Sequence, residues 1–498
     1  MIERDSSKRA GPFRHFTPMR FRSIITLLFL PFLCKASFDF NANCKAAYYN
    51  IINLKIEQGK DFITKEKKEH PDNKITVLLE NYCDFLTLII TEERPKYELW
   101  SKEKTARLAL IEASDKNSPW FLYSKAEINL QWAFVEIKFG DNMKAAIDIN
   151  KSYTQLQSNE KKFPGFIPTK KCLGLLHALI GNIPDNYKWA ADLIGVKGTV
   201  KEGIAELQKV LSTAEKGGEF SFLETESLFY LSFIQLNLNN DEKEQEKILV
   251  KTEKINDSPL LCYAAAGMAL HTGNNTRCSQ ILSRVIFEDA HLDFYYLDYM
   301  RGVVLMNELD TLSKAYFSNY VHNFKGINFI KAAYRNMAWC SLIQGDRKEY
   351  LSYMEFVKVK GNTMTDEDKQ ALKEAKEGIM PDVNLLRARL LFDGGYYHEA
   401  LVEVLKAEPK KFKVMRDVIE FEYRLARIHH KLNETEKAIA YYKLAIKSGE
   451  KFKYYFAANS ALQLGLIYET LNDKEDAKLW FSHCITMKDH EYQDSIEL

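Results

Sequence analysis

Residues that interrupt regular secondary structure are scarce in this sequence. Proline accounts for 12 and glycine for 22 of the 498 residues, so most segments can form helices without a break. The chain also lacks the local motifs of phosphate-binding loops, zinc proteases, α/β-hydrolases and dinucleotide-binding folds. We therefore expect a protein that is not an enzyme and that carries neither a cofactor nor a metal ion.

Cysteine and histidine are present, but not in the spacings of metal sites. No Cys-x-x-Cys occurs among the 8 cysteines, which argues against a zinc knuckle or a thioredoxin-like redox pair. We interpret the cysteines as small buried hydrophobic residues, and Cys262 and Cys278 as the one pair worth testing for a disulfide. Four histidines near the C-terminus are interpreted as exposed helical residues: His429, His430, His483 and His490.

Clusters of charge of one sign are also missing. The chain has 69 basic and 68 acidic residues, and its candidate basic stretch, residues 409–416, is short enough for a solvated loop. A surface that binds nucleic acid needs clustered lysine and arginine, because affinity comes from the release of counterions from phosphates. We therefore expect no nucleic-acid partner.

A short apolar run near the N-terminus, residues 24–33, follows two arginines and precedes small residues before Ser37. This order predicts a signal peptide over residues 1–36 and export to the periplasm or the medium, with association with the cell envelope left open. The run is about half of the ~20 residues that span a bilayer, so no stable membrane span is expected. Translation starts at Met1 or at Met19; the sequence leaves both open.

Three segments near the C-terminus repeat one pattern. Their alanine anchors, Ala400, Ala438 and Ala477, lie 38 and 39 residues apart. The second and third units, "LARIHHKLNETEKAIAYYKLAIKS" and "LGLIYETLNDKEDAKLWFSHCITM", each have an apolar helix pattern, a polar turn and another apolar helix pattern. Such a unit cannot bury its apolar face alone and must stack on its neighbours, which predicts an all-α helix-turn-helix solenoid.

These units resemble the tetratricopeptide repeat, in which small residues mark close helix contacts and large residues lie between them. The usual repeat has about 34 residues, and we expect the surplus here, in "GEKFKYYFAAN", to lengthen a helix. More degenerate matches occur at residues 132–152, 264–285 and 337–357. The resemblance implies a tetratricopeptide-like superhelix over most of the chain.

Residues 170–211 depart from the repeat, with an apolar helix ending at Gly181, a turn at Pro184 and five glycines that permit close helix contact. This layout resembles bacterial exported tetratricopeptide-repeat proteins of unassigned activity. It is distantly similar to the eukaryotic family that includes the inclusion-body clearance proteins. We interpret the segment as an inserted structural hairpin, and a ligand-binding or hydrolytic pocket formed by its apolar helices is the alternative.

The pattern predicts three regions after the signal peptide. Residues 37–220 form an N-terminal helical repeat region that contains the inserted hairpin, and residues 221–360 hold degenerate repeats. Residues 361–498 hold a spacer helix and the C-terminal repeats. The spacer helix is expected to begin after Thr365, since three acidic residues follow this capping residue, and to end at Gly378.

Aromatic residues are plentiful, with 26 tyrosines and 30 phenylalanines. Tyr295, Tyr296 and Tyr299 begin the first helix of a repeat, and first helices line the concave face of such superhelices. They are our candidate partner-binding residues, with packing between helices as the alternative. The function expected overall is a scaffold that binds a protein or peptide on its concave face.

Overall fold

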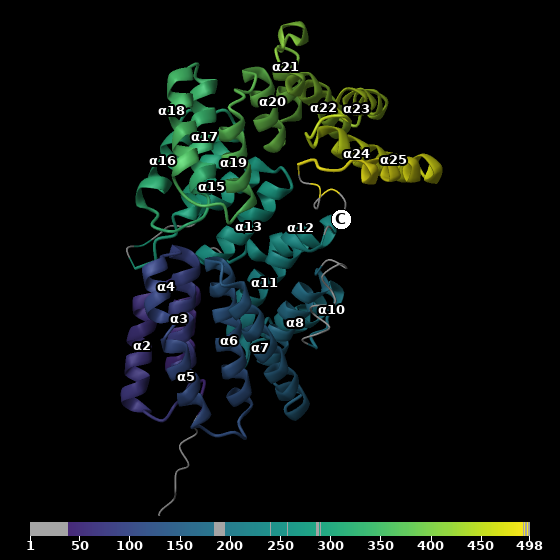
Figure 1. Cartoon of the computed structure of the whole chain (residues 1–498). Coiled ribbons are helices and arrows are strands. Elements are labelled where there is room, and N and C mark those ends of the chain that lie inside the picture. The colour runs from purple at the N-terminus through teal and green to yellow at the C-terminus, as the bar shows by residue number, and fades with distance from the viewer. Residues whose placement is uncertain are drawn as a thin grey trace, which may run out of the picture. The chain divides into compact units, whose positions relative to one another are not determined.

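Antiparallel helix pairs follow one another along the chain in the computed structural model (Figure 1). The structure describes residues 38–183, 195–239, 241–255, 257–284, 288, 290–491, 493 and 496. Within these residues there is no β-strand, which confirms the expected all-α class. The predicted signal peptide lies outside them.

The N-terminal helices begin and end at residues that favour such positions. The Ser118 hydroxyl caps α6, and Pro119 occupies the first helical position, where a missing N–H costs little. Gly140 ends the same helix with a φ of 87°, from which the chain turns back. The helices of this part are α1 (Ala42–Ile52), α2 (Ile56–Glu69), α3 (Ile75–Thr91), α4 (Arg94–Trp100), α5 (Glu103–Glu112), α6 (Pro119–Phe139), α7 (Asn142–Lys162) and α8 (Ile167–Gly181).

The hairpin predicted at residues 170–211 contains α8 and α10 (Val200–Ala214), which pack with their backbones in contact. A Cβ atom on Gly174 would lie 2.9 Å from the carbonyl oxygen of Gly203, so only glycine fits this crossing. This contact confirms the close approach inferred from the glycines. The predicted turn at Pro184 and the helix after it lie outside the described residues.

One residue in the left-handed region stands between the two helices of each of eight pairs. Its φ lies between 57° and 87°, a range that glycine and asparagine adopt at low cost. These residues are Leu54, Gly140, Gly273, Leu309, Gly345, Gly395, Asn433 and Asn472. The turn therefore recurs in the degenerate repeats as well as in the two C-terminal ones.

The central helices begin after a short 3₁₀ turn, Ser221–Leu223. They include the pairs expected at residues 264–285 and 337–357, which are α13 with α14 and α17 with α18. The helices are α11 (Glu224–Asn237), α12 (Glu242–Thr252), α13 (Pro259–His271), α14 (Asn275–Arg284), α15 (Tyr296–Asn307), α16 (Ser313–Asn323), α17 (Ile330–Ile343) and α18 (Arg347–Val359).

The C-terminal part opens with the predicted spacer helix, α19 (Asp366–Glu377). Thr365 caps its start and Gly378, with a φ of 66°, ends it, as expected. A second 3₁₀ turn, Pro409–Lys411, falls in the basic stretch that was interpreted as a loop. The remaining helices are α20 (Val383–Asp393), α21 (Tyr397–Val404), α22 (Met415–Lys431), α23 (Thr435–Gly449), α24 (Phe456–Thr470) and α25 (Lys474–Thr486).

The surplus residues of the last repeats do not lengthen a helix, contrary to our expectation. Helix α23 ends at Gly449 and α24 begins at Phe456, so the surplus forms the connection between them. The anchors Ala400, Ala438 and Ala477 are all buried, as the repeat pattern requires. None of the helices in the described ranges has both the length and the apolar composition needed to cross a bilayer.

Candidate functional site

The three tyrosines predicted to bind a partner have different environments. Tyr299 is 6% exposed and its ring packs against Tyr320. Tyr295 is half-buried, and its hydroxyl donates to Asp293 at 3.1 Å. Tyr296 is also half-buried and lines a cavity. The structure thus places Tyr299 in the core and Tyr296 at a hollow, and their role in binding stays a prediction.

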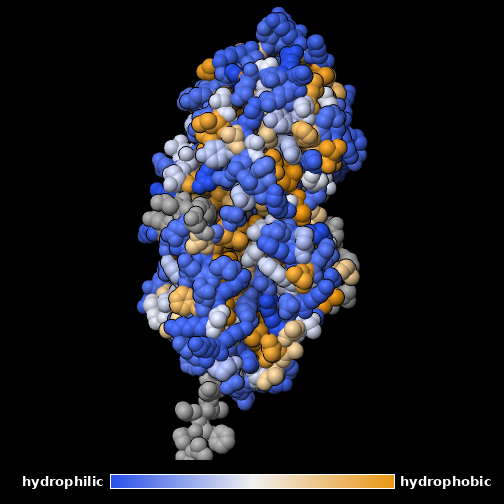
Figure 2. All heavy atoms as spheres, turned by 90° about the vertical axis from the view of Figure 1, so that its left-hand side faces the viewer, coloured by the Kyte–Doolittle hydropathy of each residue, from blue (hydrophilic) through white to orange (hydrophobic). Residues whose placement is uncertain are grey.

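The cavity has a volume of about 130 Å³ and lies among α3, α11, α13 and the segments around α15 and α17. Five phenylalanines, four tyrosines and five aliphatic residues line it, with Glu92, Lys138, Thr225 and Glu226 as the other lining residues. Figure 2 shows hydrophobic side chains gathered across the middle of the face nearest α2 and α18. An apolar cavity of roughly 150 Å³ holds a molecule of the size of benzene.

An ion pair stands at one end of the cavity. Glu92 caps the end of α3 in the left-handed conformation, and its Oε1 lies 2.6 Å from Nζ of Lys138 on α6. The backbone N–H groups of Ile327 and Asn328 donate to its other oxygen, at 3.2 and 2.9 Å. Glu92 therefore ties the end of α3 to the segment before α17.

A buried charge network lies at the other end. Lys171 on α8 is fully buried, and its ammonium donates to Glu226 of α11 at 2.8 Å and to the Tyr82 hydroxyl at 2.8 Å. It also lies 3.2 Å from Glu127 of α6. Four helices that are far apart in the sequence thus meet at one lysine.

Further donors saturate the two carboxylates. The Tyr48 and Tyr230 hydroxyls donate to Glu226, while Gln131 and the Cys172 thiol donate to Glu127. Burial would lower the pKa of Lys171, but the two carboxylates outweigh it and hold that pKa above its usual range. Burial would raise the pKa of Glu127, yet Lys171 and the donors hold that pKa below its usual range. Both groups are therefore charged at neutral pH.

A second hollow, of about 50 Å³, lies among α17, α19, α20, α22 and the start of α24. Two guanidinium groups lie over the Trp339 ring, with 4.3 Å from Arg335 and 4.9 Å from Arg389 to the ring centroid. Arg424 pairs with Glu420 at 2.9 Å, and the Tyr455 ring completes the wall. We call this surface the arginine groove; it carries charge and aromatic faces on the first helices of neighbouring pairs.

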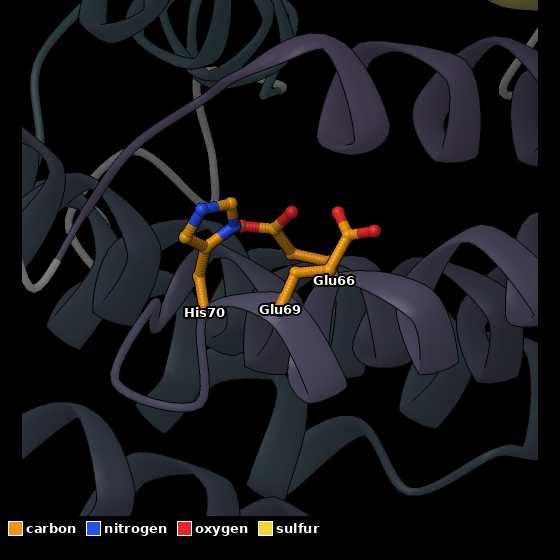
Figure 3. A group of neighbouring side chains, drawn as sticks. All are labelled: Glu66, Glu69 and His70. Carbon is orange, nitrogen blue, oxygen red and sulfur yellow. Dashed lines mark hydrogen bonds and ion pairs between the residues drawn. The ribbon is translucent and has the colours of Figure 1, made fainter.

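Two groups of three side chains have the ligand types of a metal site. In one, Glu66, Glu69 and His70 lie together at the end of α2 (Figure 3). The Glu66 carboxylate is already occupied, because it accepts from His70 and from the amides of Asn41, Asn43 and Asn73. Burial would raise its pKa, but these hydrogen bonds hold the pKa below its usual range. Glu66 therefore joins α2 to the start of α1.

The second group joins α8 to α10 beside the glycine crossing. His177 of α8 contacts Glu206 of α10, with 2.7 Å between Nδ1 and the carboxylate, and Glu202 lies 3.8 Å away. Within the described residues these contacts are made to each other across one helix pair, which accounts for their proximity.

The histidines interpreted as exposed are in fact buried or half-buried. His429 is 7% exposed, stacks on Tyr441 and contacts Glu434, while His430 contacts the Tyr442 hydroxyl. Helix α22 packs against neighbours on two sides, which the sequence pattern alone did not indicate. The described cysteines are buried, as predicted, and the thiols of Cys262 and Cys278 are free.

Comparison with known proteins identifies the C-terminal pairs. The family model for the tetratricopeptide repeat matches residues 422–448 and 458–490, so these two segments are tetratricopeptide repeats. No curated protein matches the sequence. A crystal structure described as the APC/C hetero-tetramer Cut9-Hcn1 is similar at 11% identity over 91% of this chain and 94% of that chain. Its TM-score is 0.22.

Proposed function

We propose that this chain is an exported, non-enzymatic scaffold that binds a protein or peptide partner on the first helices of its repeats. Two of its helix pairs are tetratricopeptide repeats, and stacked repeats of this kind present extended surfaces for other molecules. The partner is a protein or peptide rather than a nucleic acid, because the basic residues are dispersed and many are paired with carboxylates.

The arginine groove is the observation that carries this proposal. Tryptophan, tyrosine and arginine are the residues that dominate binding energy at protein interfaces. Here Tyr455 and Arg389, both half-buried, reach one hollow from two helix pairs, and Trp339, which is 4% exposed, forms its floor from a third pair. The groove is lined by four carboxylates as well as four cations, so a peptide that lies across it would place charged groups of both signs against them and an apolar group on the Tyr455 ring.

Capture of the partner tests this proposal. The chain that begins at residue 37 is immobilised, and proteins retained from the native extract are identified by mass spectrometry. Arg389→Glu is then compared with Arg347→Glu, which makes the same charge change at an exposed position on the second helix α18. We expect Arg389→Glu to lower the affinity for the partner at least tenfold and Arg347→Glu to leave it unchanged. Equal retention of the partner by both variants would contradict the assignment of the groove.

Export is supported by the order of basic residues, short apolar run and small residues before Ser37. N-terminal sequencing of the native protein is expected to find a chain that begins at or near Ser37. A native chain that begins at Met1 or Met19 would refute export by cleavage and would leave the groove proposal unaffected.

The alternative, a ligand-binding or hydrolytic pocket in residues 170–211, has less support. Helices α8 and α10 are in backbone contact at Gly174 and Gly203, which leaves no space between them there. None of the described residues of this segment lines the 130 Å³ cavity. Lys171 lies behind the cavity wall and holds Glu226.

A further inference from the structure

The charged side chains around the apolar cavity do not balance. Of the described side chains that line the cavity or bond to lining side chains, three are carboxylates: Glu92, Glu226 and Glu127. Two are ammonium groups, Lys138 and Lys171. A buried net charge is costly unless a counter-charge approaches it. The low pKa of Glu127 indicates that this carboxylate does not take up a proton at neutral pH.

Aromatic rings make up half of the cavity wall, nine of its 18 lining residues. The rings of Tyr82 and Tyr230 already attract one cation, since Nζ of Lys171 lies 5.6 and 5.8 Å from their centroids. Tyrosine and phenylalanine faces carry negative electrostatic potential and bind organic cations, quaternary ammonium groups above all. The walls and the net charge thus favour the same kind of ligand.

Hydrogen bonding at Glu226 indicates which kind of organic cation fits the cavity. One of its oxygens accepts from Lys171 at 2.8 Å and from Tyr48, and the other accepts from Tyr230 at 2.7 Å. A primary amine would compete with these donors for the carboxylate. A quaternary ammonium group needs no acceptor and responds only to the charge and to the ring faces. A trimethylammonium group is comparable in volume to benzene, which an apolar cavity of this size can hold.

We propose that the cavity among α3, α11, α13 and α15 binds the head group of a small quaternary ammonium compound, with Glu226 supplying the charge and the surrounding rings the contact surface. This site is separate from the arginine groove and does not depend on the scaffold function. Lys138 and Glu92 stand at its other end, where the Lys138 side chain is 30% exposed.

Choline and its uncharged isostere, in which a tert-butyl group replaces the trimethylammonium group, test this directly. Titration calorimetry with the chain from residue 37 is expected to give choline binding at least tenfold tighter than binding of the isostere. Equal affinity would show a merely hydrophobic cavity, and no binding of choline would remove the site; either result overturns the proposal.

Two charge variants test whether negative charge at the cavity strengthens choline binding. Glu226→Gln is expected to weaken choline at least tenfold and to leave the isostere unchanged. Lys138→Gln removes a positive charge at a partly exposed position, away from the buried network, and is expected to tighten choline binding. Lys138→Gln stays informative if Glu226→Gln does not fold, and weaker choline binding in it contradicts the proposal.

Two substitutions of Tyr230 test whether the aromatic rings of the cavity wall contribute to choline binding. Tyr230→Phe keeps the aromatic face and loses only the hydroxyl, whereas Tyr230→Leu loses the face. We expect choline affinity to persist in the first and to fall at least fivefold in the second. Equal affinity in both would contradict the role of the rings.

Discussion

Replacing Lys171 by methionine removes the one cation, among the described residues, that contacts both Glu127 and Glu226. Methionine has nearly the shape of the lysine stem, so the change in packing is small and the change in charge is complete. Two carboxylates would then face each other in a dry core with only neutral donors. Removing one partner of a buried ion pair typically costs about 3–5 kcal/mol.

Glu127→Gln is the matched control. It leaves Lys171 opposite Glu226 as a neutral pair and keeps an acceptor for Tyr82 at the same place. We therefore expect a cost below about 2 kcal/mol, the range of one altered buried hydrogen bond. The difference in stability loss between Lys171→Met and Glu127→Gln is the test, rather than either value alone.

Hydrogen exchange of the α8 amides measures this difference locally. Each 1.4 kcal/mol corresponds to a tenfold change in an equilibrium constant, so Lys171→Met should speed exchange in α8 by roughly two to four orders of magnitude. The control should change it by less than about thirtyfold. Equal exchange in the two variants, or faster exchange in the control, would refute the account of the network.

Three other changes have expected outcomes of known sign. Gly203→Ala places a Cβ within 2.6 Å of a backbone nitrogen and should cost about 2 kcal/mol or more, measured by urea unfolding. Burial raises the pKa of Asp417 to about 6, above the ordinary 3.8. The contribution of this carboxyl group to the stability of the fold is therefore full below pH 4 and is lost as the pH rises through 6. Asp417→Asn should stabilise the protein at pH 7 by about 1–3 kcal/mol. Tyr299→Ala should cost about 3–5 kcal/mol, and Tyr295→Ala less than about 1, by thermal melting.

Each of these has a result that would contradict it. Gly217→Ala is the control for the helix crossing, because its Cβ would meet open space and only its φ of 79° opposes the change. A larger loss of stability in Gly217→Ala than in Gly203→Ala would contradict the close contact between α8 and α10. For Asp417, an effect that does not fade between pH 7 and pH 4 excludes titration as the cause. For Tyr299, an unchanged melting temperature together with weaker partner binding would return this residue to the binding surface.

Local chemistry accounts for what could be predicted from the sequence. The spacer helix could be located because both of its ends depend on short-range effects. The Thr365 side chain accepts a hydrogen bond from the backbone N–H of Asp368, and Gly378 adopts the left-handed conformation. The helix pairs followed from apolar spacing, and the glycine crossing from the small size of Gly174 and Gly203. The position of the surplus before Phe456 was missed, since apolar spacing does not distinguish a longer helix from a longer connection.

The cavity and the buried network could not be predicted in this way. Lys171 meets Glu226 across 55 positions and Tyr82 across 89, and nothing in the local pattern marks a lysine in an apolar helix as buried. His429 was misplaced for the same reason, because its burial comes from Tyr441 on the next helix.

Hydrogen exchange of the chain with and without its captured partner locates the surface on which the partner binds. We expect slower exchange in the first helices that form the arginine groove, α17, α20, α22 and the start of α24, with no change in the second helices α18, α23 and α25. Protection confined to the second helices, or spread evenly over both, would contradict binding on the first-helix surface.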